Sequence, residues 1–278
     1  MKFIDAFWRA VLIFVAGCVI QIVAGILVPM KAIAKPHLME WLLLANAITV
    51  GALAVVAVRT EWRGWRLGVA VAAIPLAITS VNMLEGTVFL TNTDLQWGRI
   101  FVYTLVSACL IVPVWTLAFG RGDGAPVEHF HPIESKSRVE RAWKFVVCDF
   151  AYFFLYFTAG TIVFPFVKDF YATQHLPPMT TLLALQLLVR GPVFVVLCLA
   201  LVRMLGMPRL TGALVVGAVF TIVSGVAPLL LPNPVFPDAV RWAHMCEVTS
   251  SNFVFGVIVA LLWGRPGMAE PQALRRAA

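Results

Sequence analysis

The sequence predicts an all-α membrane protein, a bundle of about eight transmembrane helices built as two parallel four-helix repeats. Three observations support this prediction: the composition, the recurrence of long apolar segments, and landmarks that return in the same order in each half. Hydrophobic residues make up 61% of the 278 residues, and charged residues only 13%. A soluble domain of this size does not bury so much apolar surface, so lipid must cover the excess.

Apolar segments of about 20 residues, enough to cross a hydrocarbon core about 30 Å thick, recur along the chain. The predicted helices are 8–30, 39–59, 66–90, 98–120, 143–166, 180–204, 210–232 and 239–263. Most tryptophans fall near the predicted helix ends, as an aromatic belt at the membrane surfaces requires. All five cysteines lie inside the predicted helices without a CxxC pair, so we expect them to be packing residues.

The net charge of +7 is better explained by membrane topology than by nucleic-acid binding. Lys and Arg concentrate in every second loop, most of all between the fourth and fifth helices, and such loops are typically cytoplasmic. Both termini are therefore predicted to be cytoplasmic, in agreement with an even number of helices. Arginine outnumbers lysine, and alanine and valine are abundant, a composition associated with GC-rich bacteria. We therefore expect a multi-pass protein of a bacterial inner membrane, with the lipid bilayer as its partner.

Landmarks in the first half return in the second half in the same order. They are Arg9-Ala10 and Arg141-Ala142, His37-Leu38 and His175-Leu176, and Gly120-Arg121 and Gly264-Arg265. We therefore predict a first repeat at 1–120, a cytoplasmic linker at 121–141, a second repeat at 142–265 and a cytoplasmic tail at 266–278. Four helices return the chain to the same side, so the repeats would be parallel, as in some transporters.

Ionisable side chains at membrane depth are costly, which makes each one a candidate for function. His244 and Glu247 are three residues apart on the last helix, and Asn82 and Glu85 share that spacing on the third. Counting about 1.5 Å per residue, both pairs lie at similar depth in the outer half of the membrane. The predicted site comprises Glu85, Glu247 and His244 as proton- or cation-binding groups, and Asn82, Asn46, Arg190, Arg241, Ser251 and Asn252 as substrate or ion-pair contacts.

Two features near this site complete the prediction. Arg190-Gly191-Pro192 is expected to interrupt the sixth helix, because proline removes a backbone donor, and interrupted helices often line substrate sites in transporters. Asp149 on the fifth helix has no predicted partner and lies nearer the cytoplasmic side, outside the site.

Several functions are compatible with such a site. The sequence favours a transporter or permease for a small solute or ion without a cofactor, which could be proton-coupled because burial favours the neutral form of a carboxyl group. A zinc-dependent intramembrane enzyme with Glu85, His244 and Glu247 as ligands is an alternative, although GxxxxGK, GxSxG and HExxH motifs are absent. A lipid- or partner-binding module is a third class. The charged residues could also form a purely structural ion-pair network.

Overall fold

The computed structural model describes residues 3–29, 36–60, 62–89, 96–120, 137–174, 176–205, 207–232 and 236–264. The elements in these ranges are helices, and eight spans among them are long and apolar enough to cross a membrane. This confirms the predicted multi-pass helical bundle. The elements are α1 (Phe3–Leu27), α2 (Leu38–Arg59), α3 (Gly64–Phe89), α4 (Trp97–Phe119), α5 (Arg138–Tyr171), α6 (Met179–Leu185), η1 (Gln186–Arg190), α7 (Gly191–Met204), α8 (Arg209–Thr221), η2 (Ile222–Val226), α9 (Ala227–Leu230) and α10 (Asp238–Trp263).

The largest difference from the predicted boundaries is in α5, which has 34 residues and extends beyond 143–166 at both ends. Its N-terminus is capped by Ser137, whose hydroxyl accepts a hydrogen bond of 3.0 Å from the N–H of Glu140. At its other end the helix continues through Lys168 and Asp169. Hydropathy detects only the apolar middle of such a helix, so it underestimates the length when polar turns continue past the bilayer.

A π-helical turn interrupts each of the sixth and seventh spans. The N–H of Gly191 bonds to the carbonyl of Gln186 in η1, and the N–H of Ala227 bonds to that of Ile222 in η2. Both bonds reach back five residues instead of four. Pro192 and Pro228 follow directly, and proline disturbs α-helical bonding because it lacks an N–H and crowds the preceding turn. The interruption expected near Arg190 is thus a widened helical turn.

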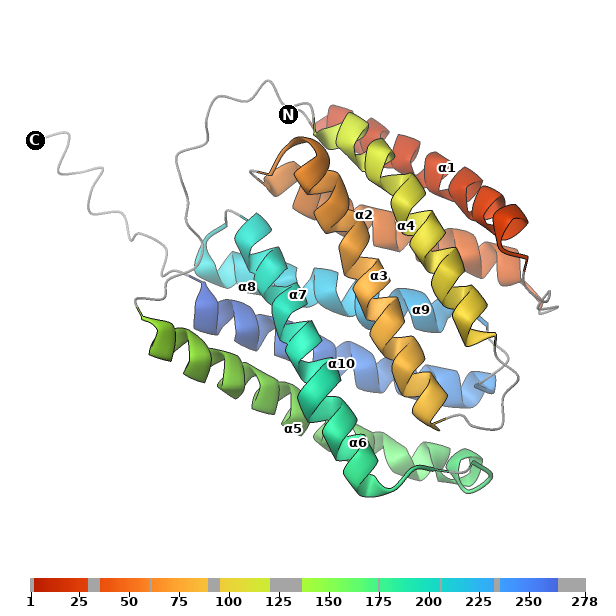
Figure 1. The fold of residues 1–278 in the computed structure, drawn as a ribbon, viewed down its shortest axis with the longest axis vertical. Coiled ribbons are helices and arrows are strands. Elements are labelled where there is room, and N and C mark those ends of the chain that lie inside the picture. The colour runs from red at the N-terminus through yellow and green to blue at the C-terminus, as the bar shows by residue number, and fades with distance from the viewer. Residues whose placement is uncertain are drawn as a thin grey trace, which may run out of the picture.

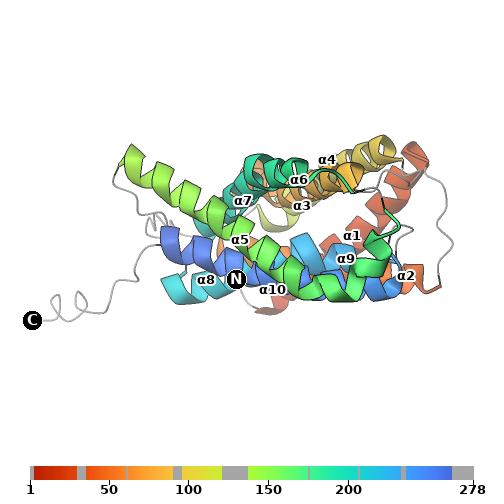
Figure 2. The same ribbon diagram turned by 90° about the horizontal axis from the view of Figure 1, so that it is seen from below.

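Within each half, the helices pack in the same order (Figures 1 and 2). α4 packs against both α1 and α3, and α10 packs against both α5 and α8. Between the halves, α2 contacts α9 and α3 contacts α7. A duplicated scaffold would have this arrangement, but the duplication, the parallel orientation and the cytoplasmic termini stay predictions. His175, the linker up to 136 and the tail 266–278 lie outside the described residues.

The centre of the bundle is formed by the sixth and seventh spans. In their most apolar windows 56% and 61% of the residues are buried, against 11% in α1 and 6% in α4. α1 and α4 therefore offer most of their apolar surface to lipid. Aromatic rings fill the core beside the interrupted spans, where Phe194 lies between Tyr152 and Phe220 at centroid distances of 5.2 and 5.0 Å.

Candidate functional site

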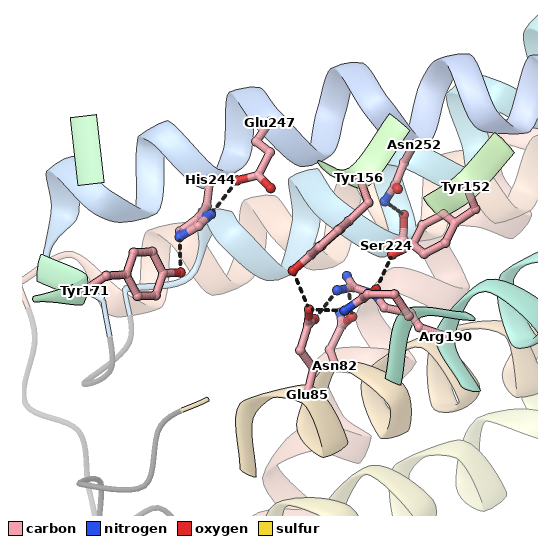
Figure 3. Close-up of polar contacts among 11 residues, drawn as sticks. Asn82, Glu85, Tyr152, Tyr156, Tyr171, Arg190, Ser224, His244, Glu247 and Asn252 are labelled. Atoms are coloured by element: carbon pink, nitrogen blue, oxygen red, sulfur yellow. Dashed lines mark hydrogen bonds and ion pairs between the residues drawn. The ribbon is translucent and has the colours of Figure 1, made fainter. Parts of the chain in front are cut away.

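The Glu85 carboxylate joins α3, α5 and η1 in one hydrogen-bonded network, the Glu85 network (Figure 3). Tyr156 Oη and Gln186 Nε2 each donate to Glu85 Oε1 at 3.0 Å. Arg190 Nη1 forms an ion pair with Glu85 Oε2, and its Nη2 donates to Asn82 Oδ1 at 3.2 Å. Both carboxylate oxygens are therefore engaged, and the negative charge is matched by a guanidinium from another span.

Local helix geometry positions the members of the Glu85 network. The two α3 residues are one turn apart and share a face. Gln186 and Arg190 stand at the two ends of η1, four residues apart, and both side chains reach the same carboxylate. Arg190 is only 5% exposed, and its guanidinium carbon lies 5.1 Å from the ring centre of Phe194 and 5.6 Å from that of Tyr156. These rings hold the planar cation by cation–π contacts.

A second network, the Glu247 network, lies between α5 and α10 (Figure 3). His244 Nδ1 is 2.8 Å from Glu247 Oε2, and His244 Nε2 is 2.8 Å from the hydroxyl of Tyr171. Glu247 is 7% exposed, and among the described residues no Lys or Arg forms an ion pair with it. Its Oε1 faces Gly160 of α5, where an added Cβ would lie 3.4 Å away. Glu247 therefore has a titratable partner instead of a permanent cation.

Hydroxyl and amide groups link the last residue of α8 and the following η2 to α10. Asn252 Nδ2 donates to Ser224 Oγ at 2.7 Å, and Thr221 Oγ1 donates to the carbonyl of Thr249 at 2.9 Å. Ser251 donates to a carbonyl of its own helix at 2.8 Å. Asn252 thus contacts the second interrupted span, whereas the Ser251 hydroxyl bonds within its own helix.

Two residues of the predicted site lie elsewhere. Arg241, 2% exposed, donates to the last carbonyls of α9 at 3.0 and 2.7 Å and pairs with Asp238 at 3.1 Å. It closes the end of the seventh span, where helix carbonyls lack partners. Asn46 Nδ2 lies 3.5 Å from Cys18 Sγ, between α2 and α1. Neither joins the two networks, because a similar predicted depth does not fix the direction in which a side chain leaves its helix.

The three ligands of the alternative zinc site belong to different networks. Glu85 contacts Tyr156, Gln186 and Arg190, whereas His244 and Glu247 contact each other. In the described part of the chain, no three His, Cys, Asp or Glu side chains are placed to hold a metal ion together.

Sequence reasoning missed the contributions of α5 and of Gln186. Tyr152, Tyr156 and Tyr171 all lie on α5, and Tyr152 Oη donates to Gln186 Oε1 at 3.3 Å. A signal was present, because tyrosines in membrane helices are enriched at the interfaces, whereas Tyr152 and Tyr156 occupy the interior of an apolar segment. Gln186 precedes Arg190 by about one turn and could have been assigned to the same face.

Together the networks provide two kinds of chemistry. The Glu85 network presents a carboxylate and a guanidinium side by side, and the Glu247 network places an imidazole between a carboxylate and a tyrosine hydroxyl. The chain matches no known family model, no curated protein and no solved structure. A fold alone does not determine function, so function must be inferred from these side chains.

Proposed function

We propose that this protein is a proton-coupled transporter of a small charged solute or ion in the cytoplasmic membrane of a bacterium. The observation that carries the proposal is the environment of Glu247. This buried carboxylate is hydrogen-bonded to His244 on its own helix, and no cation among the described residues neutralises it. Ionisable groups at membrane depth commonly serve proton relays or ion pathways.

The Glu247 network is suited to exchanging protons. Histidine changes charge near neutral pH, and a carboxylate on one ring nitrogen stabilises the protonated imidazole. Tyr171 at the other ring nitrogen can accept a hydrogen bond from the charged ring or donate one to the neutral ring. Protonation and deprotonation can therefore both be accommodated by exchange of donor and acceptor roles.

The Glu85 network is the candidate contact for the solute. Glu85 and Arg190 already neutralise each other, so Glu85 is less suited to carrying a proton than Glu247. A carboxylate on the solute could pair with Arg190, and an ammonium group could pair with Glu85. A zwitterionic solute could form both pairs. Asn82, Gln186 and Tyr156 supply hydrogen-bonding groups around the pair.

The two π-helical turns support movement around this centre. η1 carries both Gln186 and Arg190, and η2 carries Ser224, which is bound to α10. π-Helical turns occur frequently at functional sites, and discontinuous helices line the substrate sites of several transporter classes. Movement at η1 would alter the contacts of the Glu85 network without breaking the rest of the span.

Proteoliposomes test the proposal. Vesicles with a trapped pH-sensitive dye and an imposed pH gradient are offered small carboxylates, amines and zwitterions in turn, and solute and proton movement are recorded together. We expect proton-driven accumulation of at least one of these solutes by the wild-type protein. Glu247→Gln should reduce it to the level of protein-free vesicles, because the carboxyl proton is lost while the size is kept.

The matched control is Glu40→Gln, the same change at an exposed position in the first turn of α2. It should transport like the wild-type protein. Proton-driven accumulation that is equal in Glu247→Gln and wild type would rule out the proposed role of Glu247. Absence of movement of every solute by the wild-type protein would argue against transport itself.

A further inference from the structure

Polar and small residues lie along one side of α5, here called the α5 row, with Val163 and Val167 on the same side between its last two members. It contains Asp149, Tyr152, Tyr156, Gly160 and Tyr171. At about 100° per residue these positions fall within an arc about 100° wide, so they share one side of the helix. The stretch from Asp149 to Tyr171 covers about 33 Å at about 1.5 Å per residue, similar to the ~30 Å thickness of a hydrocarbon core. The row therefore runs the length of a membrane crossing.

Both polar networks lie along this row. Tyr152 and Tyr156 bond to Gln186 and Glu85, in the Glu85 network. Further along α5, Gly160 faces Glu247, and Tyr171 bonds to His244. Figure 3 shows the two networks in series, with tyrosines from α5 in each.

Asp149 occupies the other end of the row, beyond the Glu85 network. Its Oδ1 is buried and has no hydrogen-bond partner among the described residues. A Cβ on Gly191 would collide with this oxygen, so the carboxyl group rests directly against the backbone where η1 ends. Gly191 is thus the residue whose lack of a side chain admits Asp149 to the interrupted span.

No described ion pair neutralises Asp149. Within two helical turns on α5 the titratable or charged side chains are Lys144, Cys148, Tyr152 and Tyr156. The elements packed against α5 carry Arg190 on η1, Cys198 and Arg203 on α7, and Asp238, Arg241, His244, Cys246 and Glu247 on α10. Lys144 pairs with Glu140 at 2.7 Å and Arg190 pairs with Glu85. An unpaired acid at membrane depth is costly as a charge, and uptake of a proton removes that charge.

We infer that Asp149 is a second proton-binding site, separated from the Glu247 network by the Glu85–Arg190 pair, and that the α5 row connects the two sites. This inference rests on the proposed transport function. The ligand is a proton, which moves from one oxygen or nitrogen to another without any change of oxidation state. With the predicted topology, Asp149 exchanges protons with the cytoplasmic side and the Glu247 network with the outer side.

Proton binding at Asp149 can be tested in the wild-type protein without any transport assay. N,N′-dicyclohexylcarbodiimide is an apolar reagent that couples to protonated carboxyl groups, and peptide mass spectrometry locates the adduct. We expect modification of Asp149 and protection of Glu85, whose oxygens are held by Arg190, Gln186 and Tyr156. An unmodified Asp149 under conditions that modify other carboxyl groups within the helical spans overturns the inference.

Asp149→Asn tests the connection in proteoliposomes, with Asp169→Asn as control, because Asp169 is an exposed acid of the same helix. Asp149→Asn should abolish proton movement and Asp169→Asn should preserve it. If Asp149→Asn moves protons and solute like wild type while Glu247→Gln does not, the inference fails and the proposed function stands. If no solute is moved by wild type, the proposed function fails, and the labelling result alone decides whether Asp149 binds a proton.

Discussion

Glu85 and Glu247 are both largely buried acids near the centre of the bundle, yet their surroundings differ. Glu85 is bound by a guanidinium from another span and by two neutral donors, from α5 and η1. Glu247 is bound by the histidine one turn earlier on its own helix and faces the bare backbone of Gly160. The first acid therefore connects three helical elements, whereas the second is bound by a side chain of its own helix.

Because their partners differ, the two acids are expected to have different roles. A carboxylate paired with arginine stays charged, and loss of one partner leaves the other charge buried. A carboxylate paired with histidine can gain or lose a proton at little cost, because its partner titrates too. We therefore expect the Glu85 network to determine the stability of the bundle and the Glu247 network to determine proton exchange.

The strongest test compares the two partners of the Glu85 ion pair. Glu85→Gln leaves a buried guanidinium that cannot lose its charge, whereas Arg190→Met leaves a carboxylate that can take up a proton. Glu85→Gln should lower the free energy of unfolding by about 3–5 kcal/mol and Arg190→Met by less. Unfolding of the detergent-solubilised protein by increasing fractions of sodium dodecyl sulfate measures both.

A double variant and a matched variant complete this test. Glu85→Gln combined with Arg190→Met should be more stable than Glu85→Gln alone, because no unpaired charge remains. Glu247→Gln should cost only about 1 kcal/mol, since the amide oxygen can still accept from His244. Equal losses for Glu85→Gln and Glu247→Gln would remove the proposed distinction between the two networks.

The next largest effect on stability is expected from alanine substitutions at two glycines, Gly191 at the end of η1 and Gly160 beside Glu247. A Cβ on Gly191 would collide with Asp149 Oδ1 and lie 2.9 Å from the Gln186 carbonyl oxygen, whereas one on Gly160 would be in ordinary contact with Glu247 at 3.4 Å. Gly191→Ala should therefore lower stability by about 1–3 kcal/mol. Gly160→Ala should stay within about 0.5 kcal/mol of wild type.

Thermal unfolding followed by circular dichroism distinguishes these two glycine variants. Gly51→Ala is the control, because no atom lies within 4 Å of the added Cβ. A clear loss of stability in Gly160→Ala, equal to that of Gly191→Ala, would mean that Glu247 is packed as tightly as the η1 region.

The fold was predictable because every helix that crosses a membrane needs about 20 mostly apolar residues, and hydropathy detects such segments. The spacing of His244 and Glu247, and of Asn82 and Glu85, also identified neighbours on a helix, since three residues make nearly one turn. The π-helical turns were not predictable from proline alone. Pro75, Pro113 and Pro165 lie inside α-helices that continue without a π-helical turn, so tertiary packing selects where proline widens the helix.

The membership of the site was predictable only in part. Depth along a helix can be counted from the sequence, but the rotation of each helix about its axis depends on its neighbours. Arg190 therefore pairs with Glu85 as expected. Arg241 instead binds a carbonyl at the end of α9, and the Asn46 side chain contacts α1. Tyr156 was absent from the predicted site, because its hydroxyl donates to Glu85 across helices that are distant in the sequence.

The smallest effects on stability are expected from Tyr→Phe changes at the tyrosine of each network. Tyr156→Phe removes one of two donors to Glu85 Oε1, and Gln186 remains to satisfy that oxygen, so a loss of about 1 kcal/mol is expected. Tyr171→Phe removes the hydroxyl that contacts His244 Nε2, with a similar or smaller loss of stability. Stability alone thus does not separate the two variants.

Proton movement in proteoliposomes does separate them. Tyr171→Phe should slow it more than Tyr156→Phe, because the imidazole of His244 loses the group with which it exchanges donor and acceptor roles, whereas Gln186 still links Tyr152 to Glu85 when the Tyr156 hydroxyl is absent. Tyr103→Phe, whose hydroxyl is 3.4 Å from the Gln21 carbonyl on α1, is the control for loss of a tyrosine hydroxyl. If Tyr156→Phe slows proton movement more than Tyr171→Phe, the Glu85 network limits proton movement, and the division of roles between the two acids is wrong.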